Sequence, residues 1–163
     1  MVAAGIITAG SAGASASITL DGSFSIKATA PSGVAGICPS LVAPECGTVE
    51  LAGLGTADWE YQFGPTFEPV GRCFDVDGTF TLTLQSDGST ISGPLTGVFC
   101  PRPSEAGSQH PQGRAFGNPF VEDDTVLLAD GTGQFDGLSG SASFHTFSAG
   151  ARFAGTLEGT LSG

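Results

Sequence analysis

Apolar and polar residues alternate along most of this chain. In the segment DWEYQF, Trp59, Tyr61 and Phe63 fall on one side of the alternation and polar residues on the other. Three further segments share the period of two: SFSIKATA (23–30), TFTLTLQ (79–85) and RFAGTLEGTLSG (152–163). Because successive side chains of a β-strand point to opposite faces, the pattern predicts half-buried strands with one apolar face each. Nowhere does a helical period persist for about a dozen residues.

Turn signals separate the predicted strands. The dipeptide Asp-Gly occurs at Asp21-Gly22, Asp77-Gly78, Asp87-Gly88, Asp130-Gly131 and Asp136-Gly137. It is a strong hairpin signal because a type I′ turn needs positive φ at both central residues. Strands joined by hairpins form a meander, and closing about eight of them into a ring removes the exposed sheet edges. We therefore predict an all-β fold, a single antiparallel β-barrel of the lipocalin-like kind, in which the last strand pairs with the first.

The composition agrees with one folded domain. The chain has 163 residues, of which 40% are hydrophobic and 13% charged, and its 26 glycines lie between apolar runs. Sixteen acidic residues against five basic ones give a net charge of -11. This charge argues against nucleic acids or anionic membranes as partners, because both bind through clustered Lys and Arg. No run of about 18 apolar residues occurs, so no membrane span is predicted.

Residues 1–16 differ from the rest of the chain. A short apolar segment leads to Ala14-Ser15-Ala16, which fits the small-x-small pattern of a signal-peptide cleavage site, although a positively charged leader is missing. We expect either a signal-peptide remnant or a flexible lead-in, followed by a barrel domain at 17–163. A secreted or envelope-exterior location is the favoured interpretation.

Four cysteines also suggest an oxidising compartment. A hairpin folded about Asp87-Gly88 places Cys73 nearly opposite residue 102, one diagonal step from Cys100. This geometry predicts a Cys73–Cys100 disulfide and leaves Cys38 to pair with Cys46. The alternative, a zinc site, lacks the CxxC spacing that such sites use, so no metal is predicted.

The glycine-rich stretch DGTGQFDGLSGSASFHTF (130–147) could be a phosphate-binding loop or a set of turns. A phosphate loop must open a helix, whose N-terminal N–H groups hold the anion. Here the residues after Gly140 read as a strand, and the Walker lysine is absent. We therefore expect the glycines to allow tight turns and close strand crossings.

A family resemblance emerges around the same glycines. The segment EDDTVLLADGTGQFDGLSGSASF (122–144) resembles the part of the allene oxide cyclase and dirigent barrel-like superfamily in which an acidic and apolar strand leads into G-[TS]-G-x-[FL]-x-G-x-x-G and another strand. ARFAGTLEGTLSG (151–163) is similar to that group's closing strand, and the resemblance is clear over about residues 119–163.

The resemblance implies an eight-stranded barrel with a mainly apolar cavity. It also implies cofactor-free isomerisation, cyclisation or stereochemical guidance of a hydrophobic small molecule, and it leaves room for a homo-oligomer. The residues it assigns to the scaffold are Gly131, Gly133, Phe135, Gly137 and Gly140.

Aromatic side chains are the candidate ligand-binding residues. Trp59, Tyr61 and Phe63 project to one side of a strand, where they would form the wall of a cavity or simply part of the core. Phe80 is a further candidate from the TFTLTLQ strand. Phe116 is a candidate from the Pro- and Gly-rich connection 101–121, which would serve as a lid or as a solvated excursion. Residues 30–48 form a second long Pro- and Gly-rich connection.

Three polar residues are weak catalytic candidates. His145 would carry protons if its ring faces the cavity, whereas an exposed or hydrogen-bonded histidine is the commoner situation. Arg72 and Asp75 would form a polar pair at a pocket rim or an ordinary surface ion pair. The sequence leaves two functions open, a cofactor-free isomerase or cyclase and a non-catalytic extracellular carrier, envelope or interaction barrel.

Overall fold

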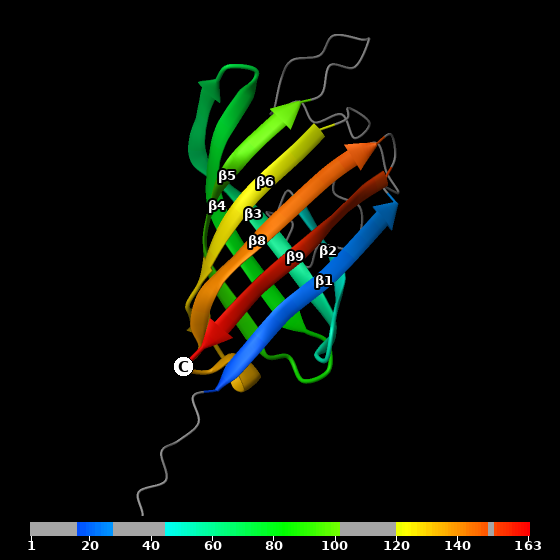
Figure 1. Cartoon of the computed structure of the whole chain (residues 1–163), viewed down its shortest axis with the longest axis vertical. Coiled ribbons are helices and arrows are strands. Elements are labelled where there is room, and N and C mark those ends of the chain that lie inside the picture. Colours follow the sequence, from blue (N-terminus) through cyan, green and yellow to red (C-terminus); the bar gives the residue numbers. More distant parts are fainter. Residues whose placement is uncertain (1–15, 28–44, 102–119, 150–151) are drawn as a thin grey trace, which may run out of the picture.

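The chain forms one antiparallel sheet that closes on itself (Figure 1). The structure, a computed structural model, describes residues 16–27, 45–101, 120–149 and 152–163. Its strands are β1 (Ser17–Lys27), β2 (Glu45–Leu51), β3 (Gly55–Val70), β4 (Cys73–Leu84), β5 (Thr90–Pro101), β6 (Phe120–Leu128), β7 (Asp130–Gly131), β8 (Ser139–Ala149) and β9 (Arg152–Ser162), with a short 3-10 helix η1 (Gly133–Phe135).

Eight strands make up the ring. Each strand pairs with the next along the chain, except that the short β7 pairs with β5 and β6 pairs with β8. The ring closes through the pairing of β1 with β9, from Ser17 opposite Ser162 to Lys27 opposite Arg152. The predicted all-β meander and its first-to-last closure are therefore confirmed.

The alternation in sequence places one face of every strand inside the ring. Trp59 and Tyr61 are buried, whereas the residues between and around them on β3 are partly or fully exposed. Phe80, Leu82 and Leu84 are likewise buried on β4. The period of two therefore identified the inward residues correctly on these strands, because each strand separates the interior from solvent.

Two of the five Asp-Gly pairs lie inside strands and not in turns. Asp21-Gly22 is in the middle of β1, and Asp77-Gly78 is in β4. A β-carbon at position 22 would collide with side-chain atoms of Val49 and Leu51, so that glycine makes room for its neighbours in the core. Asp130-Gly131 forms the short strand β7. The hairpin interpretation was wrong at these three positions, because Gly22 and Gly78 serve close packing between strands, and a β-carbon at Gly131 would collide with the backbone of Phe135.

The β4–β5 hairpin is confirmed, with a different register from the predicted one. Leu84 and Ser89 flank a four-residue turn, in which Gly88 has a φ of 74°. The turn is therefore centred between Ser86 and Asp87, so Thr83 pairs with Thr90 and not two positions further on.

This shift brings Cys73 directly opposite Cys100. The two form the predicted disulfide, with their α-carbons 4.2 Å apart. The second predicted pair involves Cys38, which lies outside the described residues, as do residues 1–15, most of the two long connections, and Phe116.

The glycine-rich segment closes the lower end of the ring in Figure 1. Phe135 of η1 is fully buried in the core, and Gly133 turns with a φ of 61° where a β-carbon would collide with the Ser89 hydroxyl. That hydroxyl accepts a hydrogen bond from the Gln134 backbone at 2.9 Å, and the Gln134 side chain donates one to Asp87 at 2.8 Å. The glycines therefore allow the chain to cross the barrel end and insert a phenyl ring.

Candidate functional site

Two acidic side chains face the interior of the ring from β6. Glu122 is fully buried and Asp124 is 5% exposed, and they share the inward face of their strand with Val126 and Leu128. The intervening Asp123 is exposed on the outside. Acidic residues are rarely buried in a protein core, so this pair is the most unusual polar feature of the described interior.

The backbone register defines the surroundings of each carboxyl group. Glu122 pairs with Phe99 on β5 and with Thr146 on β8. Asp124 pairs with Gly97 on β5 and with Phe144 on β8. Both carboxyl groups therefore project from a wall that is otherwise mostly aromatic or small.

Two glycines provide space for polar groups inside the ring. A β-carbon at Gly97 would collide with the Asp124 carboxylate, so this carboxylate lies over β5. A β-carbon at Gly78 would collide with the Tyr61 ring, so this ring leans from β3 over β4. Gly97 pairs with Val76 and Gly78 with Leu95, which makes the two glycines diagonal neighbours on paired strands.

Tyr61 and Asp124 therefore approach the same part of the interior from opposite sides. Diagonal neighbours on paired strands lie roughly 7–8 Å apart, so the Tyr61 ring and the Asp124 carboxylate occupy neighbouring positions on the inner face of β4 and β5. Tyr61 and Thr146 are both fully buried, and Thr146 Oγ1 has no hydrogen-bond partner within the described part of the chain. We call Tyr61, Glu122, Asp124 and Thr146 the interior polar group.

Aromatic rings continue from this group towards the upper end of the ring, where β5 ends and β6 begins (Figure 1). The Phe99 ring lies 5.1 Å from that of Phe120 and 6.3 Å from that of Phe67. Phe67 in turn lies 4.5 Å from Phe74. These four rings, the upper aromatic row, lie beside the Cys73–Cys100 disulfide, which joins the strands that carry Phe74 and Phe99.

The middle of the ring is filled by the protein's own aromatic side chains. Phe144 has its ring centre 5.0 Å from those of both Trp59 and Phe80, and Phe24 lies 5.0 Å from Trp59. The predicted ligand-binding residues Trp59 and Phe80 are thus core residues in this structure. Phe63 is partly buried and packs on Tyr61 at 4.3 Å.

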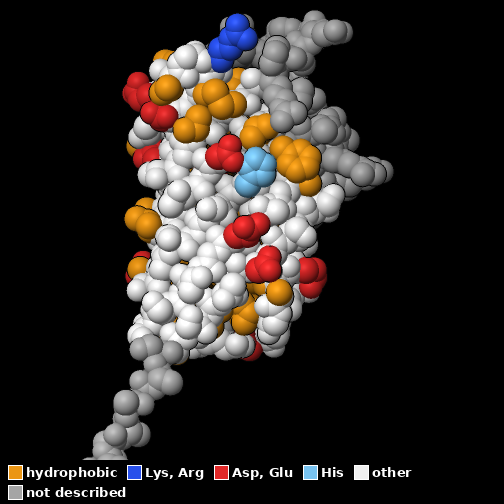
Figure 2. Space-filling view, in the orientation of Figure 1, with side chains coloured by type: hydrophobic (Ala, Val, Ile, Leu, Met, Phe, Trp, Pro, Cys, Tyr) orange, Lys and Arg blue, Asp and Glu red, His pale blue; other side chains and the backbone are white. Residues whose placement is uncertain are grey.

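His145 faces outward. Its Nδ1 contacts Oδ1 of Asp123, and the two side chains are 43% and 71% exposed. The condition for a proton carrier in the cavity, an inward-facing ring, is therefore not met, because the neighbours Phe144 and Thr146 occupy the inward positions. Figure 2 shows this histidine on the outer surface beside acidic and hydrophobic side chains.

Arg72 and Asp75 are both exposed near the β3–β4 turn. Within the described ranges, no ion pair joins them, so the predicted polar pair is not formed. Both lie outside the ring and apart from the interior polar group.

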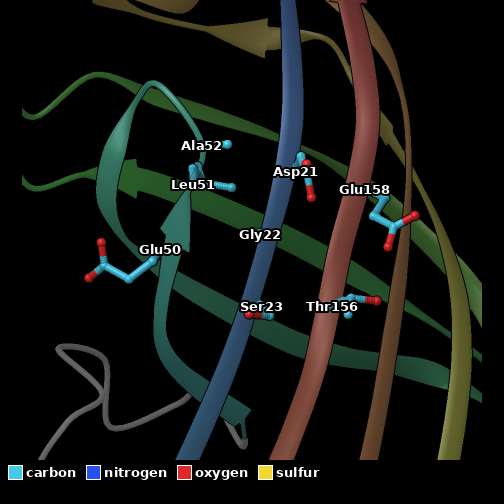
Figure 3. Close-up of a pocket in the computed structure, with 8 residues that line it drawn as sticks. All are labelled: Asp21, Gly22, Ser23, Glu50, Leu51, Ala52, Thr156 and Glu158. Carbon is cyan, nitrogen blue, oxygen red and sulfur yellow. The ribbon is translucent and has the colours of Figure 1, made fainter.

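A hollow of about 320 Å³ lies on the outer surface between β1, β2 and β9 (Figure 3). It forms because β1 and β2 pair at only two positions before they diverge. Asp21, Glu50 and Glu158 line it, but Glu50 points away from the other two carboxylates. In the described ranges, no group of three or more His, Cys, Asp or Glu side chains is placed to hold a metal ion.

Glu122 and Asp124 were not among the residues predicted from the sequence, although the signal was present. In the segment VEDDTVLL, both acidic residues fall on the same set of alternate positions as the apolar residues Val126 and Leu128. The period of two therefore places them on the buried face, and only their charge suggested an exposed position.

Comparison with protein-family models, with curated proteins and with solved structures finds no match to this chain. The superfamily resemblance of residues 119–163 therefore stays a prediction. Over the residues described, the structure has no helix of the length and apolar character needed to cross a membrane.

Proposed function

We propose that this barrel binds an apolar small molecule at its upper end and converts it without a cofactor, as an isomerase or cyclase. The observation that carries the proposal is the burial of Glu122 and Asp124 on the inward face of β6. Removing a charged carboxylate from water costs several kcal/mol. Proteins that break a local folding rule in this way tend to do so at functional sites.

The upper aromatic row supplies the apolar surface that such a molecule would contact. Phe67, Phe74, Phe99 and Phe120 lie next to the interior polar group, and Glu122 pairs directly with Phe99. Binding sites for small molecules are typically apolar and aromatic, with few polar groups that fix the orientation. This arrangement supports a ligand with an apolar body and one polar function.

The chemistry follows from what the interior polar group contains. Carboxyl and hydroxyl groups can transfer protons and hold a flexible molecule in one reactive conformation. Isomerisation and cyclisation need only those two contributions. A location outside the cytosol is part of the proposal, and it is supported by the Cys73–Cys100 disulfide.

Binding of a neutral fluorescent probe tests this proposal. N-phenyl-1-naphthylamine should bind to the folded protein, with increased probe emission and quenching of Trp59, which is the only tryptophan. Substituting Phe99→Ala should weaken binding, whereas the exposed Phe147→Ala on the outer face should not. If the folded protein does not bind the probe, the proposed function fails.

A non-catalytic barrel is the second candidate. The contacts among Phe24, Trp59, Phe80 and Phe144 favour it, because the middle of the ring is packed like an ordinary core. This candidate predicts that Glu122→Gln and Asp124→Asn leave every function of the protein unchanged. Loss of turnover with retained probe binding in these variants would exclude it.

A further inference from the structure

We propose that the outer face of the ring, at its upper end, is a docking surface for a protein segment that combines apolar side chains with Lys or Arg. This surface lies outside the barrel, apart from the interior polar group of the proposed function. It is built from outward side chains that the strand register places side by side.

Apolar residues line up across the outer face of six strands. Each member of this row is paired or disulfide-bonded to the next: Val70, Cys73, Cys100, Val121, Phe147 and Ala154. The buried residues Phe99, Glu122 and Thr146 take the inward positions next to three of them, so the row faces outward. Val98, two positions before Cys100 on β5, lies on the same face. We call the row together with Val98 the outer apolar patch.

Three side chains of the outer apolar patch are well exposed to solvent. Val70 is 51% exposed, Phe147 41% and Val98 37%. Figure 2 shows hydrophobic side chains gathered across the upper part of this face. The outward level of Thr96 and Thr125, below the patch, is polar. Isolated exposed apolar residues are ordinary on a protein surface, whereas a contiguous patch marks an interaction site.

Carboxylates without a cationic partner lie beside the patch. Glu68 and Asp75 pair directly across β3 and β4, and both are exposed. Val98 lies between Asp75 on β4 and Asp123 on β6. Asp123 contacts His145, whereas in the described ranges the side chains of Glu68 and Asp75 make no ion pair or hydrogen bond. Like charges directly opposite each other destabilise a sheet, so a cation from a partner would relieve this repulsion.

The charge around the patch indicates the kind of partner. A second copy, also with a net charge of -11, would bring acidic residues against acidic residues, which opposes association. An anionic lipid surface is disfavoured for the same reason. Arg72 lies in the β3–β4 turn, and no ion pair joins it to Asp75 in the part of the chain described. A cationic and apolar segment would cover Val98 and Phe147 while its Lys or Arg side chains approach Glu68 and Asp75.

A cationic amphipathic peptide tests this docking surface. The probe is a fluorescein-labelled peptide built only of leucine and lysine, and the matched control peptide has glutamate at every lysine position. Fluorescence anisotropy measures the dissociation constant of each. We expect the lysine peptide to bind and the glutamate peptide not to bind. The affinity for the lysine peptide should fall as the ionic strength rises from about 0.01 M to about 0.15 M.

Variants of the patch distinguish docking from a general attraction between a cation and an acidic protein. Phe147→Ala and Val98→Ala leave the net charge unchanged, and each should raise the Kd of the lysine peptide about tenfold. Leu127→Ala is the matched control, because Leu127 is exposed on the outer face of β6 but lies outside the patch. It should leave the Kd unchanged.

A second set of variants tests the carboxylates. Glu68→Gln/Asp75→Asn should raise the Kd about tenfold at low salt and reduce its dependence on ionic strength. Asp130→Asn/Asp136→Asn removes the same number of charges from exposed positions around η1, far from the patch along the strands, and is the matched control. It should change the Kd much less than the first pair does.

The outcomes decide between docking and its alternatives. No binding of the lysine peptide, or equal Kd values for the patch variants and their controls, overturns the proposal. Sedimentation velocity of the protein alone and flotation with phosphatidylcholine vesicles test two other occupants. A dimer or a vesicle complex that Phe147→Ala abolishes would assign the patch to a second copy or to lipid, and would also overturn it. Near-ultraviolet circular dichroism and urea unfolding show that each variant is folded.

Discussion

The carboxylate of Asp124 lies over Gly97, its partner on the neighbouring strand, where no β-carbon would fit. Substituting Gly97→Ala forces the carboxylate and the β6 backbone to move. We expect a loss of about 1–3 kcal/mol in the free energy of unfolding, as for overpacking elsewhere in protein cores. Urea unfolding measures it, and Thr96→Ala, exposed on the same strand, is the control. Equal stability of the two variants would show that Gly97 does not provide this space.

The Cys73–Cys100 disulfide should contribute substantially to stability. It joins residues 27 positions apart in sequence. By the chain-entropy model a bridge that closes a loop of this length stabilises the fold by about 3–4 kcal/mol. The double variant Cys73→Ser/Cys100→Ser should therefore unfold at a lower urea concentration, with a free energy of unfolding that is lower by this amount. A difference below about 1 kcal/mol would contradict the prediction.

Phe144 should be one of the most important core residues. Its ring contacts Phe24, Trp59 and Phe80, and it is almost completely buried. Phe144→Ala should lower the free energy of unfolding by about 3–5 kcal/mol and shift the emission of Trp59.

Phe147→Ala is the matched control on the same strand. Its ring is 41% exposed, so we expect a change within about 0.5 kcal/mol. Similar losses of unfolding free energy in Phe144→Ala and Phe147→Ala would contradict the assignment of Phe144 to the inner face and Phe147 to the outer face of β8.

The turn that holds η1 should make stability depend on acid pH. A hydrogen bond from the Gln134 side chain, and then those from Ser89, hold the pKa of Asp87 below its ordinary value of 3.8. Because the pKa is lower in the folded state, the ionised carboxylate stabilises the fold above the unfolded pKa, and this contribution is lost as the pH falls through the folded value.

The variant Asp87→Asn should therefore be less stable than the parent protein at neutral pH, and the difference should disappear in strong acid. Thermal unfolding at neutral pH and at about pH 2 measures this, below the usual range for Asp. A difference that is the same at both pH values would refute the role of the Asp87 charge.

The fold was predictable because the ring separates two environments along every strand. Trp59, Tyr61, Phe80 and Leu157 all follow the period of two, and all are buried. The Cys73–Cys100 pair was found despite a predicted register two residues away, since a diagonal and a direct neighbour are both within reach. A turn of four residues could not be distinguished from a two-residue turn by its Asp-Gly dipeptide alone.

The candidate site was only partly predictable. Tyr61 was identified as an inward-facing aromatic residue, but its approach to Asp124 depends on Gly78 and Gly97, which become neighbours only when β4 and β5 pair. His145 was a candidate because it is titratable, and the sequence did not show whether its side chain points inward or outward. In the structure it points outward. Charge and chemical reactivity therefore suggested candidates that burial and strand register did not support.

The proposed function requires that the upper interior, beside Tyr61, Asp124 and Phe99, accepts an apolar small molecule. The most direct measurement is a set of intermolecular nuclear Overhauser contacts between N-phenyl-1-naphthylamine and assigned side chains of the protein. We expect contacts from the probe to the rings of Phe99 and Tyr61. Contacts confined to outward side chains such as Phe147, or no contacts at all, would contradict it.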